Sequence, residues 1–319
     1  KEMWLDNFFG KKIYVWFEAV IGYLSASIEW SQRETGDSLV IFNNNSSLSR
    51  DWKEWWLNPS SKHYYFMGQD NLVFHTIMWP AQLIGTQRNY VLPYNVVVNK
   101  FMNYEGKKFS KSKNWIIDSK ALAEKYGVDT VRFYLALTLP ENKEGNFSWN
   151  EFKLSVNSNL VGNIGNFWHR NLSFLFNKLG GSIDLSDYNI DLEVKRQIEQ
   201  TFIKVKKCLE ECQFVNALNT IIVLSAFGNK YFDENKIWQL VKENPQKAKE
   251  VMLNLLNIVL NLALLLAPFI PESAEKLFKI MGVAFPTPAV GKDNIVPVRL
   301  SSFRLALQPN PLFGKIEEP

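Results

Sequence analysis

Four lysines stand close together in the segment Gly106-Lys107-Lys108-Phe109-Ser110-Lys111-Ser112-Lys113-Asn114. An ammonium group leaves water only when it is paired, so this lysine segment should lie at the surface. Each lysine is a mobile point charge with three N–H donors, and a glycine-led loop can also turn backbone N–H groups toward phosphate oxygens. The segment therefore suits a polyanion, although on composition alone a solvated basic loop is the commoner case.

Strands and helices that would position this segment alternate along the first part of the chain. Strands are predicted at 13–17, 63–67 and 94–101, with helices over 18–33, 51–58 and 70–84. This alternation predicts a parallel sheet, whose ligands bind beyond the carboxyl ends of the strands. Trp16, Asp70 and the lysine segment all follow or end a predicted strand, so we expect them to share one site.

From residue 117 onward the pattern is helical. Helices are predicted at 121–126, from Trp149 to the glycines 180 and 181, and over 192–212, 216–232, 245–267 and 272–281. We place a boundary near Trp149, between an α/β half and a helix bundle. Residues 283–319 are rich in proline and are expected to form an extended tail that packs back on the body.

Composition indicates a globular chain with an ample core, because 46% of its 319 residues are apolar and 21% are charged. The net charge of +4 permits nucleic-acid binding without arguing for it. Cys208 and Cys212 have no further ligands nearby, so we expect buried thiols in a reducing, cytoplasmic setting. The apolar run 251–270 raises the question of a membrane helix. Its asparagines share one helix face, which favours a buried core helix and no membrane partner (Asn254, Asn257 and Asn261).

Several segments, in order, resemble one family of class I aminoacyl-tRNA synthetases. Lys108-Phe109-Ser110-Lys111-Ser112 resembles their Lys-Met-Ser-Lys-Ser signature, with Phe109 in place of Met. The methionine-pocket segments of methionyl-tRNA synthetases resemble Tyr14-Val15-Trp16-Phe17-Glu18-Ala19-Val20-Ile21-Gly22-Tyr23, and also Phe66-Met67-Gly68-Gln69-Asp70-Asn71 with Phe74-His75 and Trp79-Pro80-Ala81. Val20 and Glu18 depart from the family, which usually has Pro and Asp at these positions.

The resemblance implies an α/β plus all-α fold. It divides the chain into the second half of a Rossmann-like catalytic domain (1–102), a lysine-loop connective region (103–148), an α-helical anticodon-binding bundle (149–282) and the tail (283–319). The family's His-Ile-Gly-His type motif is absent, since His63, His75 and His169 are the only histidines. The family's zinc-binding insertion is absent as well. We therefore expect a C-terminal portion, either a natural split subunit or a fragment, that works with a partner carrying the missing motif.

The resemblance also assigns site residues. Methionine is expected at Trp16, Ala19, Tyr23, Asn71, His75 and Trp79, and ATP at Gly68, Asp70, Lys108, Ser110 and Lys111. Lys111, supported by Lys108, is expected to be catalytic, and the methionine tRNA anticodon is expected at Asn166, Arg170 and Trp238. A thioether is a weak acceptor, so an aromatic cage with the Tyr23 hydroxyl and an imidazole N–H of His75 suits it.

Several of these assignments have a plainer structural alternative. Asn71, His75 and Trp79 recur at i, i+4 and i+8 and also fit an ordinary core stripe. Asp70 also fits a helix N-cap, and Asn166 with Arg170 fits a solvated helix face.

The reaction implied is attack of the methionine carboxylate on the α-phosphate of ATP, followed by transfer of the acyl group to the terminal adenosine of tRNA. Magnesium would be carried on the phosphates with most of its waters, and no zinc site is expected in this chain. A non-catalytic tRNA-binding remnant is the alternative function, and a synthetase for another aliphatic amino acid is a minor one.

Overall fold

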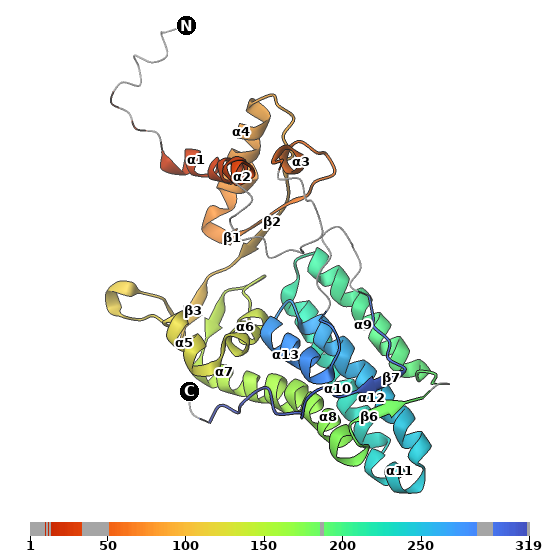
Figure 1. Cartoon of the computed structure of the whole chain (residues 1–319). Coiled ribbons are helices and arrows are strands. Elements are labelled where there is room, and N and C mark those ends of the chain that lie inside the picture. The colour runs from red at the N-terminus through yellow and green to blue at the C-terminus, as the bar shows by residue number, and fades with distance from the viewer. Residues whose placement is uncertain are drawn as a thin grey trace. The chain divides into compact units, whose positions relative to one another are not determined.

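The computed structural model describes residues 10, 12, 14–33, 51–185, 188–285 and 296–317. The chain divides into two compact units (Figure 1). The first comprises residues 1–101 with 288–291, and the second comprises residues 102–287 with 292–319.

A parallel pair of strands forms the centre of the first unit. Strand β1 (His63–Gly68) pairs with β2 (Pro93–Asn99), in a register that runs from Tyr64 opposite Asn95 to Gly68 opposite Asn99. Their connection contains the 3₁₀ turn η2 (Gln69–Asn71), the π-helical turn η3 (Phe74–Met78) and helix α4 (Trp79–Gly85). The helical crossover between parallel strands confirms the βαβ pattern predicted from the sequence.

The predicted strand at 13–17 is wrong. Val15–Ala19 form helix α1, which begins where the Phe17 amide donates to the Tyr14 carbonyl at 2.8 Å, and Ile13 lies outside the described residues. A short apolar run has the same pattern in a buried strand and in a helix, so periodicity could not distinguish between them. Helices α2 (Gly22–Gln32) and α3 (Lys53–Trp56) complete the unit. Its small core consists of Val20, Trp56, Tyr65, Trp79 and Leu83.

Three short strands open the second unit. Strand β3 (Met102–Tyr104) lies between β4 (Lys107–Lys108), which is antiparallel to it, and β5 (Gly145–Phe147), which is parallel to it. Helices α5 (Ser119–Tyr126) and α6 (Val128–Leu137) connect β4 to β5. Asp118 caps α5 by accepting from the amides of Lys120 and Ala121, and Gly127, at φ +87°, separates the two helices.

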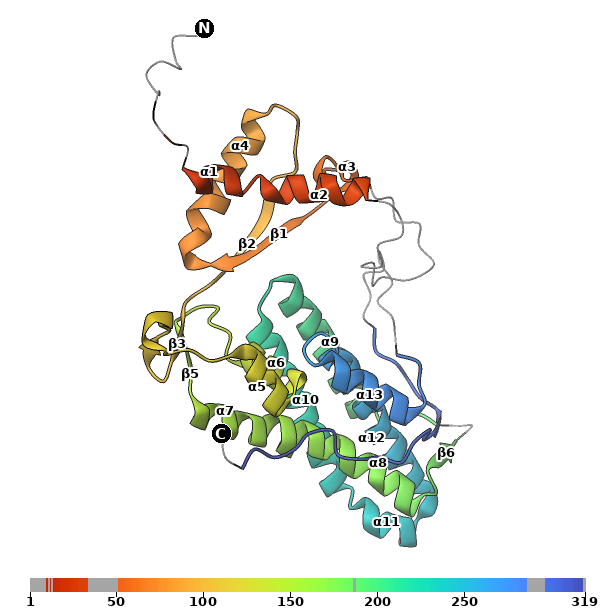
Figure 2. The same ribbon diagram turned by 60° about the vertical axis from the view of Figure 1, so that its left-hand side comes forward.

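One continuous helical rod leads from this sheet into the bundle (Figure 2). It joins α7 (Trp149–Ser155), the π-helical segment η5 (Val156–Gly165) and α8 (Asn166–Lys178). The remaining helices are α9 (Leu192–Glu210), α10 (Phe214–Glu234), α11 (Ile237–Glu243), α12 (Pro245–Leu266) and α13 (Pro271–Met281). The bundle matches the predicted helical half.

Helix α12 is the centre of the bundle. It is long and apolar enough to cross a membrane by length and composition, yet 83% of its apolar window is buried against the rest of the protein. Asn254, Asn257 and Asn261 are buried on it, as the sequence predicted for a core helix. Asn254 accepts from the Tyr188 hydroxyl at 2.7 Å, so its amide has a partner inside the fold.

The described part of the tail, 296–317, is held by asparagine side chains. Asn257 pairs with both backbone groups of Leu300, and Asn261 pairs with both backbone groups of Val298. Asn157 does the same with Ile316 on the rod. Strand β7 (Ser302–Arg304) adds an antiparallel pairing with β6 (Ser182–Asp184).

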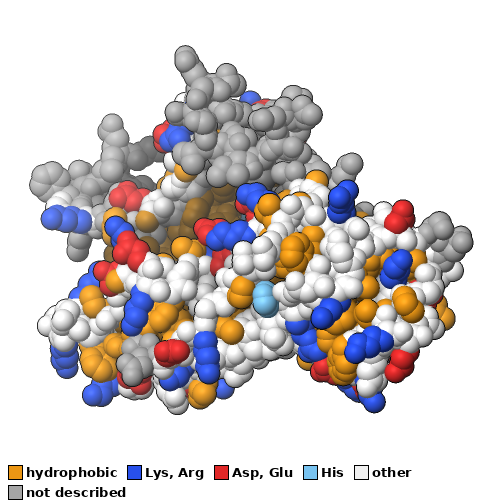
Figure 3. All heavy atoms as spheres, turned by 60° about the horizontal axis from the view of Figure 1, so that its bottom comes forward, with side chains coloured by type: hydrophobic (Ala, Val, Ile, Leu, Met, Phe, Trp, Pro, Cys, Tyr) orange, Lys and Arg blue, Asp and Glu red, His pale blue; other side chains and the backbone are white. Residues whose placement is uncertain are grey.

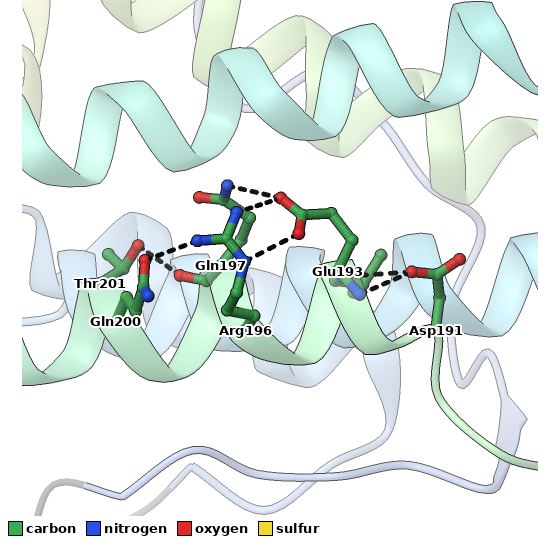
Figure 4. A network of polar contacts seen from close by, with 7 residues as sticks. Asp191, Glu193, Arg196, Gln197, Gln200 and Thr201 are labelled. Carbon is green, nitrogen blue, oxygen red and sulfur yellow. Dashed lines mark hydrogen bonds and ion pairs between the residues drawn. The ribbon is translucent and has the colours of Figure 1, made fainter.

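The start of α9 is fixed by a polar network (Figure 4). The Asp191 carboxylate accepts from the amides of Glu193 and Val194, which caps the helix. Arg196 then donates two hydrogen bonds to the Glu193 carboxylate, at 2.8 and 2.5 Å. These bonds, with one from the Gln197 amide, lower the pKa of Glu193 to about 2.

On the face drawn in Figure 3, basic and acidic side chains are interspersed, in keeping with the low net charge of +4.

Candidate functional site

An aromatic cluster with a buried histidine occupies the first unit. The Tyr23 hydroxyl lies 2.9 Å from Nε2 of His75, and the two rings meet edge-on at 5.6 Å. Tyr65 meets both of these rings, at 5.2 Å from Tyr23 and 5.7 Å from His75, and its hydroxyl accepts from the Trp79 indole at 2.9 Å. Three predicted methionine-site residues are thus brought together, with Tyr65 at their centre.

The hydrogen bonds of His75 determine its tautomer. Nδ1 lies 2.9 Å from the carbonyl oxygen of Asn71, which can only accept, so Nδ1 carries the proton. In this tautomer Nε2 is unprotonated and accepts from the Tyr23 hydroxyl, which lies 2.9 Å away. Both hydrogens are thus engaged inside the cluster, and the expectation that the Tyr23 hydroxyl and an imidazole N–H face a thioether stays a prediction.

Trp16 and Ala19 come from α1. The Trp16 ring stacks on Phe74 at 5.5 Å with an interplanar angle of 27°, and it stays 44% exposed. Phe74 precedes His75 in η3, so this stack joins α1 to the cluster. Ala19 is exposed at the last position of α1. The idealised helix face predicted for Asn71, His75 and Trp79 is replaced by 3₁₀, π and α turns, and π-helical turns occur frequently at functional sites.

Gly68 and Asp70 stand where β1 ends. Asp70 is exposed, and its carboxylate lies 2.7 Å from the position that a Cβ on Gly68 would take, so a larger residue at 68 would displace it. The turn η2 has no side-chain cap, and the N-cap alternative for Asp70 is therefore wrong. Its Oδ1 accepts from the Asn71 side-chain amide at 3.5 Å, and the exposed carboxylate can still accept from hydroxyl groups of a ligand.

A tight hairpin presents the lysine segment in the second unit. Tyr104 pairs with Lys107 across a two-residue turn in which Glu105 and Gly106 both have positive φ, at 46° and 74°. Such turns match the twist of antiparallel strands and favour glycine. The Glu105 carboxylate accepts from the Trp149 amide at 2.8 Å, which ties the hairpin to the first residue of the rod.

A second pairing closes the segment into a loop. Ser110 and Trp115 exchange backbone hydrogen bonds of 3.0 and 2.9 Å, and Asn114 between them adopts the left-handed conformation at φ 51°. Phe109 stacks on Tyr104 at 5.8 Å while remaining 41% exposed. The Trp115 indole donates to the Tyr104 carbonyl at 3.0 Å. The loop therefore rests on an aromatic base.

Three of the four lysines line a cavity of about 470 Å³, whose lining residues are Lys107, Lys108, Phe109, Ser110, Lys113 and Trp115. Lys111 is exposed and is not among the lining residues. Within the described part of the chain, none of the four lysines is paired with a carboxylate. Their charges are thus free for an anionic ligand.

The expectation of one site shared by Trp16, Asp70 and the lysine segment stays a prediction. Trp16 and Asp70 belong to the first unit, and the lysine segment belongs to the second. The part of that argument that placed Trp16 at a strand end is wrong, because Trp16 lies in α1.

Arg170 and Trp238 both contact Phe232 near the C-terminal end of the rod. The Arg170 guanidinium carbon lies 3.8 Å from the centre of the Phe232 ring, and the Trp238 ring lies 6.0 Å from the same ring. Trp238 is 45% exposed, so a planar ligand can reach it. Asn166 is exposed at the start of α8, four residues before Arg170 on the same helix.

Sequence reasoning missed Tyr65, Trp115 and Phe232, and it quoted Phe74 only as part of a motif without a role. Each is an aromatic residue inside a strand, a helix or the lysine loop, and nothing in its spacing distinguishes it from a core residue. Burial raises the pKa of Tyr65, which keeps its phenol neutral. Among the residues that the structure describes, no three His, Cys, Asp or Glu side chains gather to hold a metal ion, and Cys208 and Cys212 are free thiols.

Comparisons with known proteins place these residues in a family context. Residues 5–172 match the family described as tRNA synthetases class I (M), and residues 186–319 match the anticodon binding domain of methionyl tRNA ligase. A methionine–tRNA ligase of Bacillus cereus is 35% identical over 313 residues, which cover 98% of this chain and 53% of that protein. One of Methanopyrus kandleri is 35% identical over 278 residues, covering 87% of this chain and 39% of that protein.

Solved structures agree with the sequence comparisons. The free methionyl-tRNA synthetase of Mycobacterium tuberculosis is similar with a TM-score of 0.75 at 25% identity, covering 96% of this chain and 56% of that one. The same enzyme in complex with methionyl-adenylate gives 0.75 at 26% identity, covering 94% and 55%. The chain thus spans about half the length of the proteins it resembles.

Proposed function

This chain belongs to the class I methionyl-tRNA synthetases, and we propose that it supplies the lysine loop, much of the methionine pocket and the anticodon-binding helices of an enzyme that joins methionine to its tRNA. Residues 1–102 would supply the second half of the catalytic domain, 103–148 the lysine-loop region, 149–282 the anticodon-binding bundle and 283–319 the tail. The substrates would be methionine, ATP and the methionine tRNA, in the cytoplasm.

The lysine loop is the observation that carries this proposal. Lys107, Lys108 and Lys113 line one cavity, and none of these lysines is paired with a carboxylate among the described residues. Such a cluster suits the triphosphate of ATP, with Ser110 as a further donor. Lys111 points to no described partner and would join the phosphates when the loop closes over them, as mobile active-site loops do. Magnesium would arrive with ATP, where it neutralises phosphate charge.

The reaction requires no enzyme nucleophile. A methionine carboxylate oxygen attacks the α-phosphorus of ATP in line and pyrophosphate leaves. A hydroxyl of the terminal adenosine of the tRNA then attacks the acyl carbon and AMP leaves. The protein would act by holding the reactants in line and by stabilising the charge that grows on the phosphate oxygens, with Lys111 and Lys108 as the principal donors.

The aromatic cluster would bind the methionine side chain. Trp16, Ala19, Tyr23, Asn71, His75 and Trp79 would enclose it, with Gly68 and Asp70 beside the nucleotide. Because His75 and Tyr23 donate to groups within the cluster, contact with the thioether would require the Tyr23 hydroxyl to turn from Nε2 toward the sulfur. Thioether contacts with aromatic rings would supply the rest of the affinity.

The helical bundle would read the anticodon. Asn166, Arg170 and Trp238 would contact bases splayed out of the loop, as single-stranded RNA is usually recognised. Full activity would also need the part of the catalytic domain that carries the His-Ile-Gly-His type motif, from a second subunit or from further sequence. This chain by itself is then expected to show no methionine-dependent pyrophosphate exchange, and measurable exchange would contradict the need for that part.

The catalytic role is tested by Lys111→Ala in the complete assembly. We expect methionine-dependent pyrophosphate exchange to fall by about 100-fold or more, the usual effect of removing one donor to developing charge. Lys120→Ala is the matched control, because Lys120 is a highly exposed lysine on α5. Near-normal exchange in Lys111→Ala would remove the catalytic role and favour a non-catalytic tRNA-binding remnant.

The anticodon role is tested separately by Trp238→Ala. Loss of one stacked base costs about 1–3 kcal/mol, so aminoacylation should weaken by about 5- to 150-fold. Pyrophosphate exchange should stay close to its normal rate, because exchange needs no tRNA. Equal loss of the two activities would contradict an anticodon role for Trp238.

A further inference from the structure

A buried phenylalanine lies between the two residues that we assign to anticodon reading. Phe232 is in the last turn of α10 and is 6% exposed. Arg170, from α8, lies over the face of its ring at 3.8 Å, and Trp238, from α11, lies 6.0 Å away with an interplanar angle of 33°. Phe232 therefore contacts both residues at once, although they come from different helices.

Helix α10 holds the Arg170 guanidinium by three side chains on one face. Nη1 donates to Oδ1 of Asn229 at 3.3 Å, and Nη2 donates to Oδ1 of Asp233 at 2.5 Å. Asn229, Phe232 and Asp233 are spaced i, i+3 and i+4, which places them together on the helix. A guanidinium has five N–H donors, so three remain for a ligand after these two bonds.

The turn between α10 and α11 directs Trp238 to the same place. Lys236 adopts the left-handed conformation at φ 43°, which is uncommon for a residue with a side chain. Such conformations persist where the surrounding structure fixes them, and they gather at binding sites. Here the turn brings the indole beside Phe232 and leaves it 45% exposed.

We propose that Phe232 is a positioning residue of the RNA site, whose ring orients the Arg170 guanidinium and the Trp238 indole together. A splayed base would stack on the indole while its edge meets the free N–H groups of Arg170. Phe232 itself would touch no RNA. The proposal rests on the proposed tRNA function and adds a residue that works through two others. An aromatic ring is needed, since a guanidinium is attracted to the π-face and not to an aliphatic group.

The test uses the chain itself and RNA hairpins. One hairpin carries the methionine anticodon CAU, and a second has its first anticodon base changed. Binding to both is measured for the wild type, Phe232→Leu and Phe174→Leu, with thermal unfolding recorded for each protein. Phe174 is the matched control, because it packs edge-on against Phe232 at 5.8 Å from the side of α8.

We expect Phe232→Leu to weaken CAU binding by about 10-fold and to reduce the preference for CAU over the altered hairpin, because stacking and cation–π contacts are lost. Phe174→Leu should lower the unfolding temperature about as much as Phe232→Leu does, but it should keep the preference for the CAU hairpin. Phe232→Tyr, which retains the ring, should keep the preference as well. These readouts separate positioning from core packing.

A double-mutant cycle tests whether Phe232 acts through Arg170. The double variant Arg170→Ala/Phe232→Leu should bind the CAU hairpin at most about threefold more weakly than Arg170→Ala alone. Once the guanidinium is gone, Phe232 has lost one of the two groups that it positions, so its removal costs less. Additive losses would overturn the proposal, as would an unchanged preference in Phe232→Leu or an equal loss of preference in Phe174→Leu. A wild-type chain without any preference would overturn the tRNA function itself, and this proposal with it.

Discussion

Removing the side chain of Asn261 should loosen the tail and lower the stability of the bundle. Asn261 is fully buried on α12, where it donates to Val298 at 2.7 Å and accepts from the Val298 amide at 2.8 Å. A third bond, 2.8 Å long, joins its amide to the Asn257 carbonyl on the same helix. In Asn261→Ala these bonds are lost, and both backbone groups of Val298 lose their partner on α12.

The expected loss follows from those contacts. Each intramolecular hydrogen bond contributes about 0.5–1.5 kcal/mol net, and an unpaired buried group costs about 1–3 kcal/mol. We therefore expect the free energy of unfolding to fall by about 2–4 kcal/mol in Asn261→Ala. Urea denaturation followed by circular dichroism measures it, and hydrogen exchange at the Val298 amide should become faster. Asn216→Ala, at an exposed position on α10, is the control and should change stability by less than about 0.5 kcal/mol.

Two results together would refute this reasoning. The free energy of unfolding of Asn261→Ala would stay within about 0.5 kcal/mol of the wild type, the range of ordinary surface substitutions. The Val298 amide would also keep its protection from exchange. In that case the tail would be held by its apolar side chains, and the paired amides of α12 would be incidental.

Three further changes test local features. Gly106→Ala should cost about 1 kcal/mol in urea denaturation, because φ is 74° while the space around the glycine is open, and an unchanged midpoint would contradict the hairpin turn. Lys236→Gly should stabilise the chain by up to about 1 kcal/mol in the same assay, since glycine adopts a positive φ without strain; destabilisation would show that the conformation is unstrained. Hydrogen bonds from Arg196 and then from Gln197 lower the pKa of Glu193 from 4.5 to about 2. The wild type should therefore be more stable than Glu193→Gln, and this difference in stability is fully present above pH 4.5. It should disappear as the pH falls to about 2, and a difference that persists there would contradict the ion pair.

Spacing along the sequence predicted best where a residue's environment follows from its own helix. The asparagines of α12 share one face, so burial of that face required partners, and the structure supplies them. The Asp118 cap of α5 likewise involves only neighbours in the chain, the amides of Lys120 and Ala121. By contrast, Ser148 makes no capping bond at the start of the rod, where the carboxylate of Glu105 accepts from the Trp149 amide instead.

Contacts between segments that are distant in the sequence could not be predicted. Tyr65 and Phe232 are aromatic residues in apolar runs, which every core contains, and only tertiary packing places one beside His75 and the other beneath Arg170. The hydrogen bonds of the Tyr23 hydroxyl were likewise beyond prediction, because they depend on which nitrogen of His75 faces a carbonyl. The strand predicted at 13–17 failed because its apolar run has no periodicity long enough to separate strand from helix.

The unbroken rod from Trp149 to Lys178 has a consequence for the spacing of the proposed sites. Its first residue is bonded to the lysine hairpin, and Arg170 stands 21 residues further along. An α-helix of that length would span about 32 Å, and the rod is somewhat shorter because the ten residues of η5 are π-helical. Within the second unit the rod therefore sets the distance between the proposed phosphate-binding and base-reading groups. Deleting one residue from α7, which is α-helical, would shorten the span by only about 1.5 Å but turn Arg170 by about 100° about the axis, away from Phe232. The direction in which Arg170 projects from the rod therefore depends on the exact number of residues in the rod, far more than the length of the rod does.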